Sequence, residues 1–238
     1  MEDIAIIDKI KSGPYWRVNI RPYDFEEERI GSLSEVLKLI DQCKVSLRGW
    51  TFPHIDINNT INGQDFVQSE CNSGDIIEFW KFFKSGQFIH YFSVYEDLYM
   101  KSKQENPSSM WETKSADKPS GYLGITTTIY RMTEIYEFAM RLAQKGIYNK
   151  GISISIALLG IKNFKLFYFE AERVLFRSYI SMVNEIKLES KLSLEELLAK
   201  GHDEAIKKCI QVFETFNWND SPKTVINEDQ KKFLERRI

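Results

Sequence analysis

The sequence is poor in the residues that build disulfide frameworks and metal sites. Its cysteines are odd in number and form no Cys-x-x-Cys pair, and its histidines are few and far apart: Cys43, Cys71, Cys209, His54, His90 and His202. This cysteine usage favours a reducing compartment, so we expect a cytoplasmic protein. No His-Glu-x-x-His pattern is present either, and we predict no metal and no cofactor.

The chain also lacks long apolar runs and the glycine-rich motifs of nucleotide enzymes. No segment approaches the ~18 apolar residues of a membrane span, and the first ten residues have no positively charged leader. We therefore expect neither a membrane partner nor a secretory signal. GxGxxG, GxxxxGK(S/T) and GxSxG are absent, so dinucleotide, nucleoside-triphosphate and α/β-hydrolase sites have no support. A formal net charge of −2 argues against a strongly basic nucleic-acid coat.

The densest structural signal is an aromatic hairpin over residues 77–94, densest between Trp80 and Phe92. Ser85-Gly86 is typical of a two-residue turn, which would set Lys81 opposite His90. Both faces of this hairpin are largely apolar, so it should be covered on both sides and lie in the middle of the fold. Burial beside an ammonium group would keep His90 neutral at pH 7.

Alternating and helical patterns along the chain predict an α+β fold. About seven strands, mostly joined as meanders, should form a largely antiparallel sheet packed against two long helices. The first long helix is predicted over residues 122–145, and the second after a capping box of Ser193 and Glu196. A shorter helix should begin after Ser32 and end near Cys43.

Residues 101–121 differ in composition from the rest of the chain, being rich in Lys, Ser, Gln, Glu, Asn and Pro. A structureless connection of this length is either a domain boundary or a functional flap. We predict a single α+β domain over residues 1–238 with a flexible insertion at about 101–121. The alternative is a division into two lobes, 1–100 and 122–238.

His54 and Asp56 form a candidate chemical pair after a predicted strand. An imidazole and a carboxylate suit a metal-ligand pair, or a general base with its orienting acid. Because transition-metal sites need three or four protein ligands, His90 or Glu78 would have to join them. One hypothesis is therefore a metal-dependent hydrolase or nuclease. The structural alternative is a loop histidine packed against Trp50.

Aromatic and basic residues give a second kind of candidate site. Rings on an accessible sheet face, beside arginines, can stack nucleobases, although most aromatic residues are core by default. The predicted binding residues combine these with the histidine candidates: Arg17, Arg48, Trp50, His54, Asp56, Trp80 and His90.

The chain is similar to other proteins in three segments rich in aromatic and basic residues: YWRV at 15–18, LRGWTFPH at 47–54 and SGQFIH at 85–90. On these segments the chain resembles, over most of its length, a family of bacterial proteins without an assigned activity. Related segments occur alone or beside Schlafen-like AlbA-type domains. The resemblance implies a setting of nucleic-acid handling or defence against mobile elements, and it implies no role for any single residue.

No complete catalytic constellation is visible in the sequence. We therefore predict a non-catalytic binding or interaction module of a bacterial cytoplasmic system, with a protein partner or a second copy, and with nucleic acid as a further candidate partner. Two alternatives stay open. One is the metal-dependent hydrolase or nuclease described above. The other is an obligate subunit of a protein complex, which a contiguous exposed apolar patch would favour.

Overall fold

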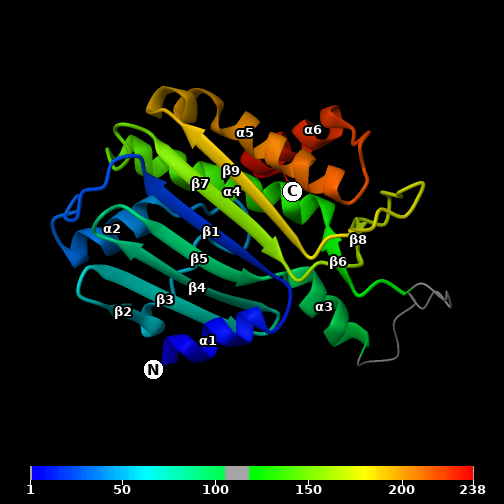
Figure 1. Ribbon diagram of the computed structural model, residues 1–238, viewed down its shortest axis with the longest axis horizontal. Helices are drawn as coiled ribbons and strands as arrows, with labels where there is room; N and C mark the ends of the chain where they lie inside the picture. The colour runs from blue at the N-terminus through cyan, green and yellow to red at the C-terminus, as the bar shows by residue number, and fades with distance from the viewer. Residues whose placement is uncertain (1, 105–117, 238) are drawn as a thin grey trace.

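The computed structural model describes residues 2–104 and 118–237 and has the predicted α+β architecture (Figure 1). Its main element is a seven-stranded sheet in the order β2-β3-β4-β5-β1-β7-β9, with every neighbouring pair antiparallel. These strands are β1 (Tyr15–Pro22), β2 (Thr60–Asn62), β3 (Phe66–Ser73), β4 (Ile76–Phe83), β5 (Phe88–Ser93), β7 (Ile152–Leu159) and β9 (Glu185–Leu192). A separate parallel pair joins β6 (Gly121–Gly124) and β8 (Phe164–Phe167).

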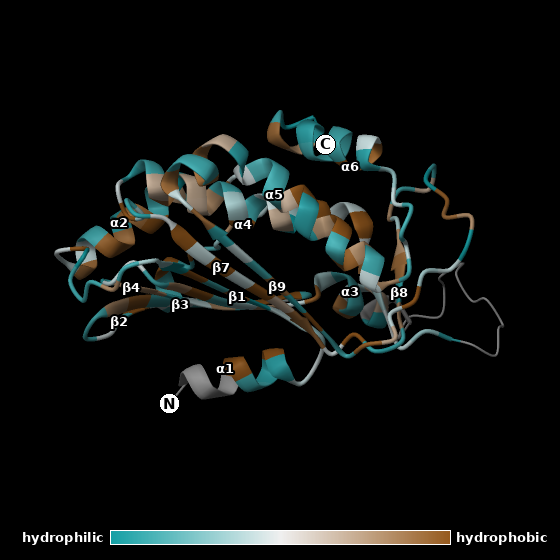
Figure 2. Ribbon diagram, turned by 45° about the horizontal axis from the view of Figure 1, so that its top comes forward, coloured by the Kyte–Doolittle hydropathy of each residue, from teal (hydrophilic) through white to brown (hydrophobic). Residues whose placement is uncertain are grey.

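Most helices form a layer on one face of the sheet (Figure 2). This layer consists of α2 (Leu33–Cys43), α4 (Ile125–Gln144), α5 (Leu194–Thr215) and α6 (Lys223–Leu234), while α1 (Glu2–Lys11) lies on the opposite face. The remaining helices are η1 (Ile57–Asn59) and α3 (Tyr95–Gln104). The two long helices are α4 and α5, which have 20 and 22 residues and pack against each other. Within residues 2–104 and 118–237, no helix has the length and apolar character to cross a membrane.

The predicted capping signals form at the helix starts. The Ser193 hydroxyl accepts a hydrogen bond from the backbone N–H of Glu196 at 3.1 Å, and the Glu196 carboxylate accepts one from the backbone N–H of Ser193 at 2.9 Å. This reciprocal pair is the capping box predicted for α5. At the start of α2, the Ser32 hydroxyl accepts from the N–H of Glu35 at 3.2 Å.

The predicted register of the aromatic hairpin is wrong by one residue. The loop is Lys84–Gly86, closed by a bond from the N–H of Phe83 to the carbonyl of Gln87 at 2.9 Å, and Gly86 has φ +85°. A three-residue loop of this kind needs a glycine in the left-handed region, so the same Gly86 serves a longer turn than expected. As a result His90 pairs with Trp80, not with Lys81.

The hairpin lies in the middle of the fold and is covered on both sides, as predicted. Between β3 and β1 in the sheet, β4 and β5 are the third and fourth strands of seven. On one face, Ile6 and Ile10 of α1 pack against Ile77 and Phe79. On the other face, Phe88 lies 4.9 Å from the Phe138 ring of α4, centroid to centroid.

The sheet contains strands from both halves of the chain, because β1 pairs with β5 on one side and with β7 on the other. The insertion predicted at 101–121 is only partly described. Residues 101–104 continue α3, and Gly121 begins β6. Of the rest, residues 118–120 are described, with the N–H of Ser120 bonded to the carbonyl of Asn163 at 3.0 Å, and residues 105–117 lie outside the described residues.

Candidate functional site

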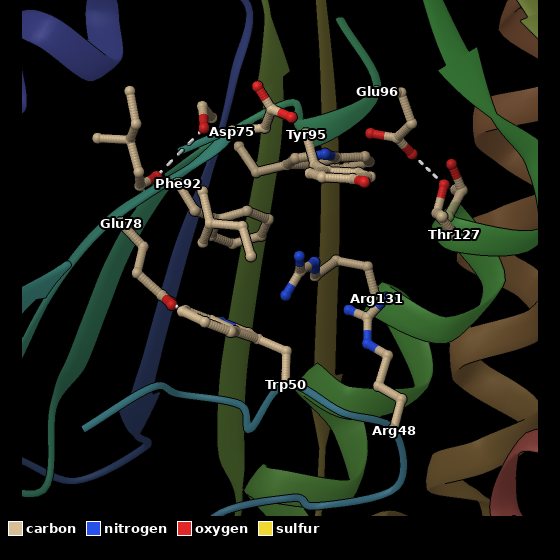
Figure 3. A pocket seen from close by; sticks show the side chains of 14 residues that line it. Arg48, Trp50, Asp75, Glu78, Phe92, Tyr95, Glu96, Thr127 and Arg131 are labelled. Carbon is tan, nitrogen blue, oxygen red and sulfur yellow. Dashed lines mark hydrogen bonds between the residues drawn. The ribbon is translucent and has the colours of Figure 1, made fainter. Parts of the chain in front are cut away.

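A pocket of about 220 Å³ lies where α3, the first turns of α4 and the loop after α2 meet the ends of β1, β4 and β5 (Figure 3). Its wall combines aromatic rings with charged groups of both signs: Trp50, Phe92, Tyr95, Glu78, Glu96, Arg48 and Arg131. Figure 3 shows the side chains of Arg48 and Arg131 pointing into the space between these rings.

Strand pairing places three pocket side chains in one row. Glu78 of β4 pairs with Phe92 of β5, and Phe92 pairs with Trp16 of β1. Paired residues on adjacent strands point to the same face, so a carboxylate and two rings lie side by side beneath the helix layer. On α4, Thr127 and Arg131 are four residues apart and therefore share the helix face that looks onto this row.

An ion pair between Arg48 and Glu134 closes one side of the pocket. The Arg48 Nε and Nη2 groups donate to the two carboxylate oxygens of Glu134 at 2.8 and 2.7 Å. The Glu134 side chain is fully buried. A bidentate guanidinium–carboxylate pair satisfies both oxygens of the acid, so Arg48 alone supplies the partner that a buried Glu134 requires.

Arg131 adds a second guanidinium beside the first. Its Nη1 donates to Oε2 of Glu134 at 3.3 Å, and its guanidinium carbon lies 4.5 Å from the centre of the Phe92 ring. Burial and the neighbouring charge of Arg48 lower the pKa of Arg131, although its ordinary value is so high that it stays charged. The bond to Glu134 is the one hydrogen bond of the Arg131 side chain to the described part of the chain.

Glu78 links the pocket to a histidine behind it. One of its oxygens, Oε1, accepts from the Trp50 indole N–H at 2.8 Å, and the other lies 2.7 Å from Nε2 of His90. Burial alone would raise the pKa of Glu78, but these two bonds and the charge of Arg131 hold it below its ordinary value. Burial lowers the pKa of His90. The pair is therefore an ionised Glu78 that accepts a hydrogen bond from a neutral His90.

Glu96, in the first turn of α3, brings a further carboxyl group to the pocket, next to the start of α4. The Thr127 hydroxyl donates to its Oε1, and Oε2 has no donor from another residue in the described ranges. Burial raises the pKa of Glu96 above its ordinary value, in spite of this bond and the positive charges of Arg131 and Arg48. A carboxyl group with one unused oxygen therefore lies across the pocket from the arginines.

The structure brings three of the predicted site residues to the pocket. Arg48 and Trp50 line it, and His90 lies directly behind it through Glu78. The His54 ring stacks on Trp50, with ring centroids 4.0 Å apart. His54 is therefore packed against Trp50, as the alternative to a chemical role expected. Trp80 is buried and donates its indole N–H to the His54 carbonyl at 2.6 Å.

The other two predicted residues lie elsewhere. Asp56 caps η1 by accepting from the N–H of Asn58 at 3.0 Å. Arg17 alternates with the buried Trp16 along β1, so it lies on the opposite face of the sheet. No three or more His, Cys, Asp or Glu side chains within residues 2–104 and 118–237 are grouped so as to hold a metal ion. His54, Asp56 and His90 are thus not gathered into one ligand set.

Sequence reasoning missed Arg131, Glu134 and Glu96. Arg131 and Glu134 are three residues apart on a predicted helix, which is the usual spacing of a solvent-exposed ion pair. The partner that distinguishes this pair from a surface one is Arg48, which is 86 residues away in the chain. The available signal was the position of Glu134 between the core residues Thr133 and Ile135 of the same helix.

Exposed apolar side chains gather in one segment, residues 169–183. They are Phe169, Val174, Phe176, Met182 and Val183, of which Phe176 is fully exposed. An exposed apolar patch is the feature that would favour an obligate subunit of a complex. That alternative stays a prediction.

Comparison of the chain with protein-family models, with curated proteins and with solved structures gave no match. The resemblance to a bacterial family, and the setting that it implies, therefore stay predictions.

Proposed function

We propose that this protein is a binding module whose pocket between Trp50 and Arg131 holds a small ligand with a flat ring. The proposal rests on one observation. The Arg131 guanidinium lies in the pocket wall, over the Phe92 ring, with a single hydrogen bond to the described part of the chain. Because a guanidinium has five N–H donors, most of its hydrogen-bonding capacity is left for a ligand.

A purely structural role explains Arg131 less well. Glu134 already has both oxygens paired with Arg48, so the ion pair is complete without a second cation. Bringing another guanidinium into a largely buried site costs desolvation free energy. The charges of Glu134 and Glu78 and the Phe92 ring offset this cost, but they leave most N–H donors of Arg131 without an acceptor in the described part of the chain. Side chains that carry such a cost are concentrated at functional sites.

The Trp50 ring and the volume of the pocket indicate which kind of ligand can bind. His54, which does not line the pocket, stacks on one face of the Trp50 indole, so the pocket receives another side of this ring. A volume of about 220 Å³ is below the ~300 Å³ at which pockets for drug-sized ligands begin. These features favour one small aromatic molecule over a polymer chain.

A ligand-observed NMR screen of small aromatic fragments tests this function. Ile76 lines the pocket, so Ile76→Trp should fill it, whereas Ile61→Trp changes an exposed isoleucine on β2 of the same sheet. We expect fragments that bind the unmodified protein and Ile61→Trp and lose binding to Ile76→Trp. The proposal is overturned if no fragment binds, or if binding survives in Ile76→Trp.

A further inference from the structure

Among the more deeply placed charged groups of the pocket wall, Arg131 and Glu96 keep hydrogen-bonding capacity that the described residues do not use, while Asp75 is a partly exposed acid of the same wall. Both oxygens of Glu134 are used by Arg48, and both oxygens of Glu78 are used by Trp50 and His90. Within residues 2–104 and 118–237, most N–H groups of Arg131 have no acceptor, and Oε2 of Glu96 has no donor from another residue. The pocket therefore offers donors on one side and an acceptor on another.

The two guanidinium groups of the pocket are matched by two carboxylates before a ligand enters, and Asp75, which also lines the pocket, is partly exposed to water. Arg48 and Arg131 are matched by the ionised Glu78 and Glu134. A ligand with a net charge would disturb this balance in a site that is shielded from water, where unpaired charges are expensive. A ligand with separated charges and no net charge avoids that cost and can still meet both unused groups.

We propose that the pocket binds a free aromatic α-amino acid, with its carboxylate on Arg131, its ammonium on Glu96 and its ring beside Trp50. The inference rests on the proposed function and names its ligand class. A carboxylate matches the two parallel N–H donors of a guanidinium, and an ammonium group matches a carboxylate oxygen that lacks a donor. The ring meets Trp50 and Tyr95, which line the pocket.

Binding of the ligand ammonium group is also consistent with the raised pKa of Glu96. Burial disfavours the ionised form of this carboxyl group in the empty pocket. A cation placed against Oε2 favours the ionised form, so binding of the ligand should lower the pKa of Glu96 from its raised position. Glu78 and Glu134 already match the two guanidinium groups, so the ligand ammonium would be the cation that pairs with Glu96.

Isothermal titration calorimetry with three matched probes tests the inference on the unmodified protein. The probes are L-phenylalanine, 3-phenylpropanoate, which lacks the ammonium, and 2-phenylethylamine, which lacks the carboxylate. We expect L-phenylalanine to bind, and each truncated probe to bind about tenfold or more weakly. Equal affinities for L-phenylalanine and either truncated probe overturn the assignment of the missing group.

Two variants assign the groups to their partners. Glu96→Gln should weaken L-phenylalanine about tenfold and leave 3-phenylpropanoate unchanged, and Arg131→Met should weaken both. Arg17→Met and Glu189→Gln, on the opposite face of the sheet, serve as matched controls that should change neither affinity. If Glu96→Gln leaves the affinity for L-phenylalanine unchanged, the inference is wrong.

The outcomes separate this inference from the proposed function. If fragments bind at the pocket but L-phenylalanine does not, the ligand class is wrong and the binding module stands. If neither L-phenylalanine nor any fragment binds, both proposals are overturned.

Discussion

Nε2 of His90 lies 2.7 Å from Oε2 of Glu78, and both side chains are buried beneath the helix layer. The other oxygen of Glu78 holds the Trp50 indole at 2.8 Å. His90 therefore acts on the pocket through Glu78, as a positioning residue for Trp50. Removal of the His90–Glu78 bond should loosen the ring that forms one wall of the pocket.

The stability of the protein should fall on acidification because of His90. Burial lowers the pKa of His90 in the folded state, so the unfolded chain binds a proton more readily and is favoured as the pH falls below the ordinary value of 6.5. Glu78, Arg131 and Glu134 are the charged groups that act on this imidazole. Glu78 adds to the same trend at lower pH, since its folded-state pKa is lowered below its ordinary value of 4.5.

Urea unfolding of the protein and of His90→Gln at pH 7.5 and 5.5 measures this effect. The unmodified protein should lose more free energy of unfolding between the two pH values than His90→Gln, by up to about 1.4 kcal/mol. The partly exposed His202 gives a control, His202→Gln, for the removal of a histidine elsewhere. Equal losses in the protein and in His90→Gln would show that His90 does not titrate as inferred.

Glu134→Gln should be strongly destabilising. The substitution leaves two guanidinium groups without their shared carboxylate, and removing one partner of a buried ion pair costs about 3–5 kcal/mol. Glu189→Gln on the exposed side of β9 should change the free energy of unfolding by less than about 0.5 kcal/mol. Urea titrations of both variants make the comparison, and similar small losses for the two would contradict a buried ion pair.

Gly86→Ala should destabilise the hairpin loop. Gly86 has φ +85°, and a Cβ atom there would lie 3.0 Å from Cγ2 of Ile147 and 3.2 Å from Cδ of Arg29. An alanine in the left-handed region costs about 1–2 kcal/mol. Gly49→Ala is the matched control, because a Cβ at Gly49 would meet no atom within 4 Å. The measurement is thermal unfolding, and an equal effect of the two substitutions would argue against the strained turn.

The fold class was predictable because it depends on local patterns. The alternation of β1, with Trp16, Val18 and Ile20 buried, and the serine caps of α2 and α5 are each determined by neighbouring residues. The hairpin register was not, since Gly86 fits both a two-residue and a three-residue loop. The one-residue difference in loop length decides which residue pairs with His90.

The candidate site was predictable only in part. Arg48 and Trp50 are recognisable as a basic and aromatic pair in the chain, and both line the pocket. Glu78 and His90 are 12 residues apart, and they meet only in the observed register. The pairing of Arg48 with Glu134 depends on how the loop after α2 docks on α4, and no local pattern encodes that contact.

The most direct test of the account is the response of the tryptophan indole N–H signals in a ¹⁵N NMR spectrum on titration with L-phenylalanine. Trp50 lines the pocket, whereas Trp218 is stacked on Tyr179 elsewhere in the core, with ring centroids 5.1 Å apart. We predict a saturable shift of the Trp50 signal with no change at Trp218, and loss of the shift in Arg131→Met. An unchanged Trp50 signal, or equal shifts at Trp50 and Trp218, would contradict binding of an aromatic amino acid at this pocket.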